Sequence, residues 1–450
     1  MKIRLLFILV ALLAITTACN HQAREQAPIR LSDEALMDTV QRQTFYYFWY
    51  GAEPISGMAR ERIRLDGDYG QYCPNTVTSG GSGFGIMAII AAIERGWITR
   101  EQGFERFERI VTFLENADSW HGAFPHWWNG ETGRVVNFMR HDNGADIVET
   151  SFLFQGLLTL HQYYVKGTEA ERALAARIDT LWRAVNWDFF RNGQNVLFWH
   201  WSPTYEWQMN HPIEGFDECL ITYVLAASSP TFPIPVETYH EGWARGGDIA
   251  TTVEVEGITL HIRHNSSAGV GPMFWAHYSF LGLDPRGLSD RHVADYFQEM
   301  RNYTLVNRAY SIRNPHGWKG FHEYSWGLTA SYSVWPGGYF AHEPQEAHDL
   351  GVITPTAALS SIVYTPEYSM QVMRYLFEEW GHKLWGPFGF FDAFSVHHDF
   401  FPQRYLAIDQ GPISVMIENH RTGLLWNLFM SHPDVQNGLR RLEFESPHLN

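Results

Sequence analysis

Residues 140–158 read RHDNGADIVETSFLFQGLL and bring three carboxylates to the start of an apolar run. Asp142 and Asp146 are four residues apart, so they share one face if both lie in a helix. Paired carboxylates in a protected site can supply the acid and the base that hydrolyse a glycosidic bond. The alternative is that these side chains cap the helix and favour its positive end, which would make Glu149 structural as well.

A second acidic group stands before another apolar stretch, in NHPIEGFDECLITYVLAASSP at residues 210–230. Glu218 is followed directly by Cys219-Leu220-Ile221, so its carboxyl is expected to be partly buried. Burial raises the pKa of a carboxyl, and a protonated carboxyl at neutral pH can act as a general acid. Favourable placement at a helix N-terminus is again the alternative.

A third group lies in AIDQGPISVMIENHRTGLLW at residues 407–426. We expect Asp409 to cap a helix that begins at Pro412, because proline is tolerated in the first turn. Glu418 stands near Arg421 inside an otherwise apolar segment, where buried polar groups need partners. It is either a functional carboxylate or one half of a structural ion pair with Arg421.

Aromatic residues make up 15% of the chain and include 18 Trp and 21 Tyr. Several are interleaved with polar residues: HWWN at 126–129, FWHWSPTYEW at 198–207 and EYSWG at 323–327. Such clusters suit sugars, because aromatic faces stack on the C–H faces of a pyranose while polar neighbours bond its hydroxyls; a single Trp is more often a core residue. The net charge of −16 argues against a nucleic-acid partner, which needs a basic surface.

Apolar residues at helical spacing recur along the whole chain and predict an all-α fold with long loops. The expected helices are 31–50, 83–95, 100–115, 145–164, 168–187, 216–227, 292–303, 355–361, 366–380 and 412–431. Residues 251–262 alternate around Glu256-Gly257 and predict a small β-hairpin, a candidate lid. About ten helices joined by long loops favour an (α/α)6 toroid with its cleft at the helix N-termini, and separate helical bundles are the alternative.

The N-terminus resembles a lipoprotein signal peptide. Lys2 and Arg4 precede an apolar run too short to span a membrane, and the run ends in ITTAC at Cys19. We therefore expect a signal peptide over 1–18, lipidation of Cys19, a tether over 19–30 and one domain over 31–450. Cys73 and Cys219 either pair in an oxidising compartment or stay as free thiols.

Seven stretches resemble the bacterial glucoamylase-like fold family and, within it, glycoside hydrolase family 144, the β-1,2-glucanases. They read SGGSGFGIMAIIAAIERGWIT (79–99), HDNGADIVETSFLFQGLL (141–158), IEGFDECLITYVLAASSP (213–230), GPMFWAHYSFLGLDPRG (271–287), NPHGWKGFHEYSWGLTAS (314–331), GPFGFFDAF (386–394) and YLAIDQGPISVMIENHRTGLLW (405–426). In the third of these, Asp217 stands where the family often has Asn.

The resemblance implies hydrolysis of β-1,2-glucan or its sophorose-series oligosaccharides with inversion, and no cofactor or metal. It places the catalytic carboxyls at Glu218, as the acid, and at Asp146 and Asp142, either of which is the base. An α-glucan hydrolase and a non-catalytic sugar-binding lipoprotein are the alternatives. The candidate substrate-binding residues are Arg60, Trp128, His277, Tyr278, Glu323, Trp326 and Glu418. The protein is expected to be an exported outer-membrane lipoprotein, facing the periplasm or the cell surface, monomeric, and held to the membrane by its lipid alone.

Overall fold

The structure is a computed structural model that describes residues 30–449, except 68, 70–72, 267–268 and 337. The expected signal peptide and Cys19 lie outside these residues. The elements and the site discussed below belong to the compact unit formed by Met37–Asn450. Helix α2 spans Asp33–Trp49, and residues 30–32 precede it in the sequence.

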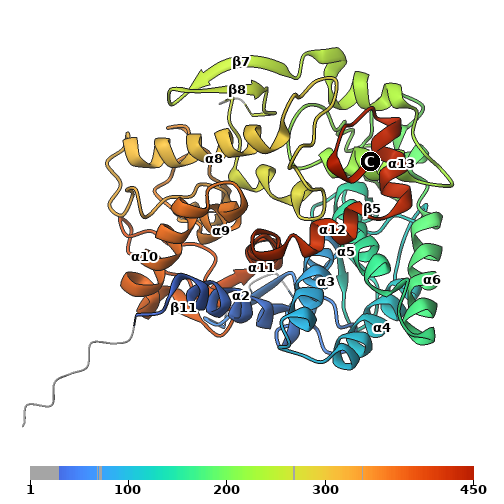
Figure 1. The fold of residues 1–450 in the computed structure, drawn as a ribbon, viewed down its shortest axis with the longest axis horizontal. Coiled ribbons are helices and arrows are strands. Elements are labelled where there is room, and N and C mark those ends of the chain that lie inside the picture. The colour runs from blue at the N-terminus through green and yellow to red at the C-terminus, as the bar shows by residue number, and fades with distance from the viewer. Residues whose placement is uncertain (1–29, 68, 70–72, 267–268, 337, 450) are drawn as a thin grey trace, which may run out of the picture. The chain divides into compact units, whose positions relative to one another are not determined.

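A group of inner helices is buried on almost every side. Its members are α3 (Ser79–Glu94), α5 (Ile147–Tyr164), α7 (Leu220–Ser228), α9 (Pro355–Leu359) and α11 (Ala407–Thr422). Buried residues follow one another along most of each of these helices, so the helices are surrounded by protein. Helix α3 contacts α5 and α11, α5 contacts α7, and α11 contacts α9, so the helices of this inner ring follow one another in the order α7, α5, α3, α11 and α9, of which Figure 1 labels the last four.

A second set of helices buries only one face and covers the ring from outside. It comprises α4 (Arg100–Asn116), α6 (Glu169–Ala184), α8 (Tyr296–Arg313), α10 (Pro366–Leu384) and α13 (Pro433–Arg441). They contact, in this order, α3, α5, the 3₁₀ turn η4 (Met273–Ala276), α9 and α7. Helix α2 covers α11, with Gln41 donating to Glu418 at 2.9 Å. This inner-and-outer arrangement is the predicted α/α toroid, and it excludes separate bundles.

Helices α3 and α5 approach each other closely at two glycines. A Cβ on Gly156 would lie 2.2 Å from the carbonyl oxygen of Gly83, and a Cβ on Gly83 would lie 2.2 Å from that of Phe152. Glycine is costly inside a helix but allows two backbones to come this close. The glycine-rich start of α3 is therefore a packing surface that brings the N-terminal ends of α3 and α5 together.

The predicted hairpin is present as β7 (Ala250–Val255) and β8 (Ile258–Ile262), with its turn at Glu256-Gly257. It is fastened to α8, because Arg313 pairs with Glu256 at 2.6 Å and Glu299 accepts from the backbone N–H of Ile262 at 3.0 Å. None of its residues lines the main cavity described below. The hairpin is therefore part of the outer layer and the lid interpretation was wrong.

The other strands of the described residues form short ladders in the loops between the helices. They are β1 (Arg62–Arg64) with β13 (Arg404–Leu406), β2 (Thr76–Thr78) with β3 (Trp127–Asn129) and β4 (Val135–Val136), β5 (Ala145–Asp146) with β6 (His200–Trp201), β9 (Ala330–Tyr332) with β10 (Tyr339–Ala341), and β11 (Trp385–Gly386) with β12 (Gly389–Phe390). Each pair fixes one loop against another with a few ladder hydrogen bonds. The strands therefore brace the loops without forming a core of their own.

Several predicted helix boundaries were wrong for local reasons. The segment expected over 412–431 is two helices, α11 and α12 (Leu424–Met430), because Gly423 turns the chain with φ of 68°. The segments expected from 216 and from 145 begin at Leu220 and Ile147.

Cys73 is exposed and Cys219 buried, and both are free thiols. No described helix has the length and apolarity needed to cross a membrane.

Candidate active site

A cavity of about 650 Å³ lies at the N-terminal ends of the inner helices. Thr78 precedes α3, Glu149 is in the first turn of α5, Glu218 precedes α7, and Ile408 is in the first turn of α11. The aromatic lining residues are Trp127, Phe138, Phe152, Trp199, Phe274, Tyr278 and Tyr339, and the polar ones include Glu61, Arg62, His126, His200 and His211. A concave, mostly apolar site with a few polar groups is typical of ligand binding.

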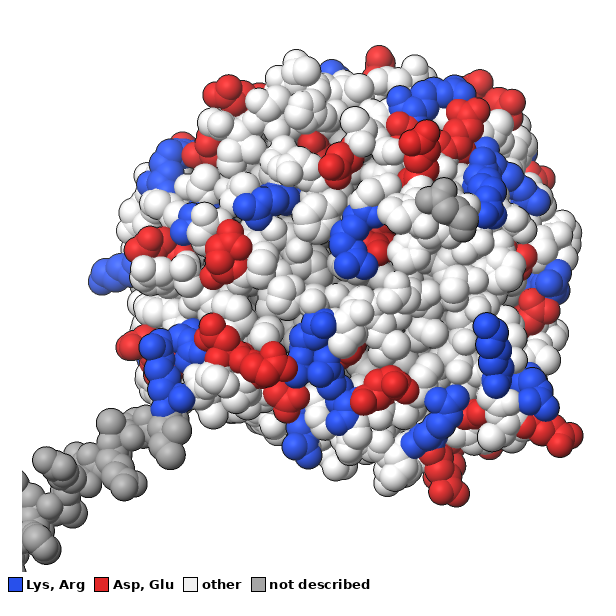
Figure 2. Space-filling view, viewed as in Figure 1, with Lys and Arg blue, Asp and Glu red and all other residues white. Residues whose placement is uncertain are grey.

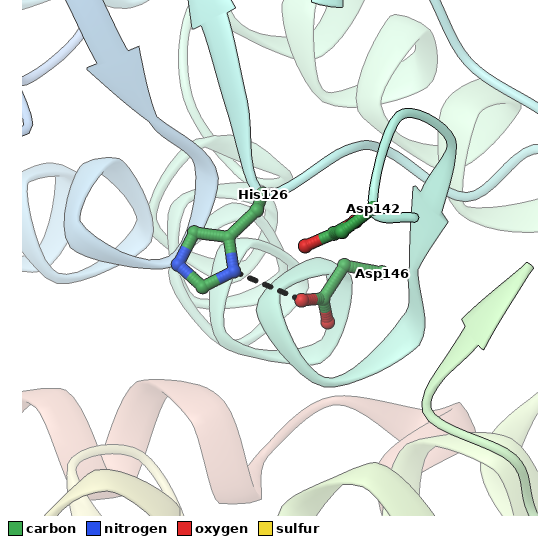
Figure 3. A group of neighbouring side chains, drawn as sticks. All are labelled: His126, Asp142 and Asp146. Atoms are coloured by element: carbon green, nitrogen blue, oxygen red, sulfur yellow. Dashed lines mark hydrogen bonds and ion pairs between the residues drawn. The ribbon is translucent and has the colours of Figure 1, made fainter. Parts of the chain in front are cut away.

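Asp146 is fully buried, and both of its carboxylate oxygens are engaged. It is the N-cap of α5, where Oδ1 accepts from the backbone N–H groups of Val148 and Glu149 at 3.0 and 2.9 Å. Oδ2 lies 3.0 Å from Nδ1 of His126 (Figure 3). Burial alone would raise the pKa of Asp146, but the hydrogen bond from His126 and the nearby His200 outweigh it and lower that pKa. Asp146 is thus an anion held in one orientation.

Asp142 does not lie in the helix, so the two aspartates do not share a helical face as the spacing had indicated. Residues Ala145 and Asp146 form strand β5 against β6, and a Cβ on Gly144 would lie 2.2 Å from the carbonyl of Trp201. The chain is therefore extended until Ile147 begins α5. Asp142 still reaches the group, and its carboxylate points toward His126 and Asp146 (Figure 3). Its Oδ2 is buried without a hydrogen-bond partner, and burial, with Asp146, raises its pKa to about 7.

Three further side chains complete this group. His200 faces Asp146 across the β5–β6 pair, with Nε2 3.7 Å from Oδ2 of Asp146 and 3.9 Å from Oδ2 of Asp142. Burial lowers the pKa of His200 to about 4, so its ring is neutral. Glu149 accepts from Gly80 N–H at 2.8 Å, and burial raises its pKa. Burial also disfavours charge on His126, but Glu149 and Asp146 prevail and raise its pKa to about 10.

Glu218 enters the cavity from the turn before α7 and is half-buried. Burial raises its pKa well above the ordinary value, and the neighbouring Asp217 adds to the effect. Asp217 itself accepts from the backbone N–H of Cys219 at 2.9 Å, and burial raises its pKa to about 6. The raised pKa favours the protonated form of Glu218, whose carboxyl lines the cavity.

Asp409 was expected to be a helix cap, and that was wrong. Helix α11 already begins at Ala407, and Asp409 lies buried within its first turn beside the carboxyl of Asp392. Burial, and then the neighbouring carboxyl of Asp392, raise the pKa of Asp409 well above its ordinary value. Two buried carboxyls in contact hold a proton between them. The pair stands beside the cavity-lining Tyr278, so the site has a second acidic group that sequence spacing had missed.

Comparisons with known proteins show which chains this one is similar to. A family model described as "Putative glucoamylase" matches residues 210–433. A crystal structure from Bacteroides caccae with the same description is 64% identical, with a TM-score of 0.91, and covers 92% of this chain and 100% of that one. An endo-β-1,2-glucanase from Chitinophaga pinensis, solved with sophorotriose and glucose, is 58% identical with a TM-score of 0.91 and covers 93% of this chain and 100% of that one.

The chain belongs to glycoside hydrolase family 144, within the glucoamylase-like fold family. A further relative, an exo β-1,2-glucooligosaccharide sophorohydrolase acting at the non-reducing end, from Parabacteroides distasonis, is 43% identical over 96% of this chain. The chain spans 61% of the length of that relative.

Of the seven candidate binding residues of this family 144 chain, the structure brings Tyr278 to the cavity lining. Trp128 was the wrong member of its motif. Successive side chains of a strand point to opposite sides, so Trp127 of β3 lines the cavity while Trp128 is fully buried and donates to the carbonyl of Asp118 at 3.0 Å. His277 is likewise buried, with Nε2 2.9 Å from Oγ of Ser361. Trp326 is a core residue, and Glu323 is exposed outside the cavity.

The two remaining candidates have structural partners. Arg60 donates to the carbonyls of Gly51 and Ala52 at 2.8 Å each and to Pro74 at 2.9 Å. Glu418 is buried and pairs with Arg95 at the end of α3 at 2.8 Å. The predicted partner Arg421 instead donates to Asp38 at 3.3 Å and Gln41 at 2.9 Å. The ion pair of Glu418 therefore joins α11 to the end of α3, and the hydrogen bonds of Arg421 join α11 to α2.

The residues that sequence reasoning missed lie in motifs it had found. His126 and Trp127 belong to HWWN, and Trp199 and His200 belong to FWHWSPTYEW. Period-two alternation would have separated Trp127 from Trp128, but it would not have found the neighbouring pairs His126-Trp127 and Trp199-His200, which line the cavity together. Glu149, expected to be structural, lines the cavity as well as binding Gly80.

Proposed function

We propose that the protein is a glycoside hydrolase that cleaves β-1,2-linked glucan or its oligosaccharides. The observation that carries this proposal is a cavity in which a protonated Glu218 faces aromatic rings and the buried Asp142–Asp146 group. The family 144 relatives support the substrate, because the printed names of those from Chitinophaga pinensis and Parabacteroides distasonis refer to β-1,2-linked glucose chains.

In the proposed mechanism, the rings of Trp127, Trp199 and Tyr278 hold the sugar chain, and Glu218 protonates the leaving glycosidic oxygen. Asp146 is committed to the helix cap and to His126, so it orients the group. We assign the base role to Asp142, whose Oδ2 has no partner. Asp142 lies behind His126 and His200, so it takes the proton of the attacking water through one bridging hydroxyl or water.

The test is product formation by the purified protein from β-1,2-glucan, sophorose-series oligosaccharides and starch. New reducing ends from the β-1,2-linked substrates alone are the expected result, and NMR of the first product should show inversion at the anomeric carbon. Cleavage of starch alone would replace this function by α-glucan hydrolysis. Binding of the oligosaccharides without cleavage would make the protein a sugar-binding module. The product lengths decide between endo and exo action.

Glu218→Gln keeps the shape of the side chain and removes the transferable proton. We expect kcat to fall by about 10²–10⁴, the usual contribution of a general acid, while the melting temperature changes little. In the wild type, the protonated form is the active one, so kcat falls as pH rises through the raised pKa of Glu218. A variant with near-normal kcat, or a wild-type rate that rises over that range, would remove Glu218 from the acid role.

We also propose that the chain is exported and anchored by a lipid on Cys19, as a monomer whose only membrane contact is that anchor. The support is the sequence of residues 1–19, which lie outside the described structure.

A further inference from the structure

The group at the wall of the cavity has a composition that exceeds the needs of acid–base catalysis. Two imidazoles and two carboxylates converge there, each from a different turn of the chain: His126 before β3, Asp142 in the loop, Asp146 in β5 and His200 in β6. One nitrogen or oxygen atom from each of His126, Asp142 and Asp146 lies within 4.8 Å of the others. Histidine and carboxylate together are the ligand set of zinc and similar transition-metal ions.

We propose that His126, Asp142, Asp146 and His200 form a binding site for one divalent transition-metal ion of the zinc type, and that an ion held there inhibits the enzyme. The ion would be an inhibitor and not a cofactor. Its binding is independent of the proposed hydrolase function, whereas the inhibition rests on it.

Three of the separations between ligand atoms in this group are close to those around a tetrahedral ion. Bonds of about 2.0–2.1 Å to nitrogen and oxygen place neighbouring ligand atoms roughly 3.3 Å apart. The separations are 3.0 Å from Nδ1 of His126 to Oδ2 of Asp146, and 3.7 and 3.9 Å from Nε2 of His200 to Oδ2 of Asp146 and Asp142. Adjustments of a few tenths of an ångström would bring these contacts into coordination geometry.

The side chain of Asp142 points independently to a ligand. Its residue is 3% exposed, and Oδ2 is buried with no hydrogen-bond partner. Figure 3 shows this carboxylate aimed at the space that His126 and Asp146 also face. A buried carboxylate oxygen without a donor is costly. An ion coordinated by that oxygen would remove the cost.

The surroundings of the four ligands also suit an ion. On its other ring nitrogen, Nε2, His126 lies 3.7 Å from Oε1 of Glu149, and a carboxylate behind a coordinating histidine orients the ring and strengthens the ligand. His126 and His200 both line the cavity, so an ion can enter from it. On binding, the ion replaces the proton between Nδ1 of His126 and Oδ2 of Asp146, and this proton is released to solvent. The bound ion then occupies Asp142, so no base is available for hydrolysis.

The experiment is titration of the purified, chelator-treated protein with Co²⁺ and with Zn²⁺. The visible absorption of four-coordinate Co²⁺ and calorimetry with Zn²⁺ report binding without any substrate. We expect one ion per chain, with Zn²⁺ displacing Co²⁺. Asp142→Asn and His200→Gln should each weaken Zn²⁺ binding at least about tenfold. Circular dichroism melting of both variants shows whether they fold, and a loss of binding in either folded variant is sufficient.

Two histidines outside the group provide matched controls. His211 lines the same cavity, with its ring 5.1 Å from that of Trp199, and His211→Gln should leave Zn²⁺ affinity unchanged. His292 lies 2.8 Å from His240 on the outer layer and could bind metal by itself. Absence of binding, equal binding by the wild type and the folded Asp142→Asn and His200→Gln variants, or loss of binding only in His292→Gln would overturn the proposal.

Inhibition is measured separately on the wild type with β-1,2-linked oligosaccharide. Zn²⁺ should inhibit at the concentration at which it binds, and a chelator should restore the rate. Binding of Zn²⁺ by a protein that cleaves no glucan would defeat the proposed hydrolase function and leave the metal site standing. An active enzyme that Zn²⁺ inhibits only at concentrations more than tenfold above its dissociation constant would refute the inhibitory role.

Discussion

At the scale of the residue, Trp127 and Trp128 show how adjacent identical side chains take different roles. Trp127 lines the cavity, while Trp128 packs between Phe113 and Phe124 in the core. The same division separates Tyr278, in the cavity lining, from His277, in the core. Mutating a residue that lines the cavity should therefore change KM, whereas mutating its buried neighbour should change the free energy of unfolding.

We predict that Trp199→Ala and Trp128→Ala have opposite signatures. Trp199 is a half-buried member of the cavity lining, so its loss should raise KM about tenfold, roughly 1.4 kcal/mol, with a small change in stability. Trp128 is fully buried, so its loss should lower the free energy of unfolding by about 3–5 kcal/mol and leave KM near the wild-type value. Urea denaturation and steady-state kinetics on both variants check this. Equal KM changes would contradict the assignment of the two faces.

The Asp392–Asp409 pair leads to a pH-dependent prediction. Burial and Asp392 raise the folded-state pKa of Asp409 above its unfolded-state value, so wild-type stability is lost as pH rises above about 4 toward that raised pKa. Asp409→Asn keeps the neutral shape and removes this loss. The free energy of unfolding of the variant, relative to wild type, should increase with pH, by at most about 1.4 kcal/mol per pH unit.

Denaturation curves at pH 5 and pH 8 measure that difference, and exposed Asp399→Asn is the control. A difference that stays constant or shrinks between the two pH values would show that Asp409 is ionised in the folded protein.

At the scale of the element, hydrophobic periodicity predicted most helices because their cores are long and apolar. It was less accurate at their N-terminal ends, where the site is built. Asp142 was placed on a helix because its spacing from Asp146 matched one turn, yet the pairing of β5 with β6 extends the chain there. That pairing joins residues 145–146 to 200–201, a long-range contact that local spacing does not encode.

The partners of buried charges were unpredictable for the same reason. Glu418 was considered with Arg421, three residues away, but it pairs with Arg95, more than 300 residues away in the sequence. The resemblance to family 144 supplied the three carboxyls that the structure gathers around one cavity, because members of a family share the fold that brings such distant residues together. It did not carry the second carboxyl pair, Asp392 and Asp409.

The glycine contact between α3 and α5 predicts a sharp difference between two helix glycines. Gly156→Ala places a methyl group against the carbonyl of Gly83 and should lower the free energy of unfolding by about 1–3 kcal/mol or more. Gly381 lies in α10 with no atom within 4 Å of its would-be Cβ, so Gly381→Ala should raise it by about 0.5–1 kcal/mol. Thermal and urea unfolding of both variants test this, and a neutral Gly156→Ala would mean that the helices can separate cheaply.

At the scale of the whole molecule, charge is dispersed. Lys and Arg side chains are interspersed with Asp and Glu over the face shown in Figure 2, and the chain carries a net charge of −16. A neutral glucan needs no electrostatic steering, so rates on β-1,2-glucan are expected to depend weakly on salt.

The lipid anchor is tested at this scale. Cys19→Ser should transfer the protein from the membrane fraction to the soluble fraction while the kcat on oligosaccharide stays unchanged, because the proposed site lies wholly beyond residue 37. Detergent phase partition and activity assays on both forms make the measurement. A wild-type protein that is already soluble would rule out lipidation.

The contact of α11 with α3 has a consequence for how the chain is made. These helices lie more than 300 residues apart, and α3 also supplies the wall on which α5 packs. During synthesis, the face of α3 that packs on α11 has no partner until residues 407–422 arrive. Most of the chain is therefore synthesised before this face of α3 is covered, and until then the face is exposed to aggregation and proteolysis. We therefore expect a chaperone that delays the compaction of α3 and α5 to improve the yield of folded protein more than a chaperone that accelerates their compaction.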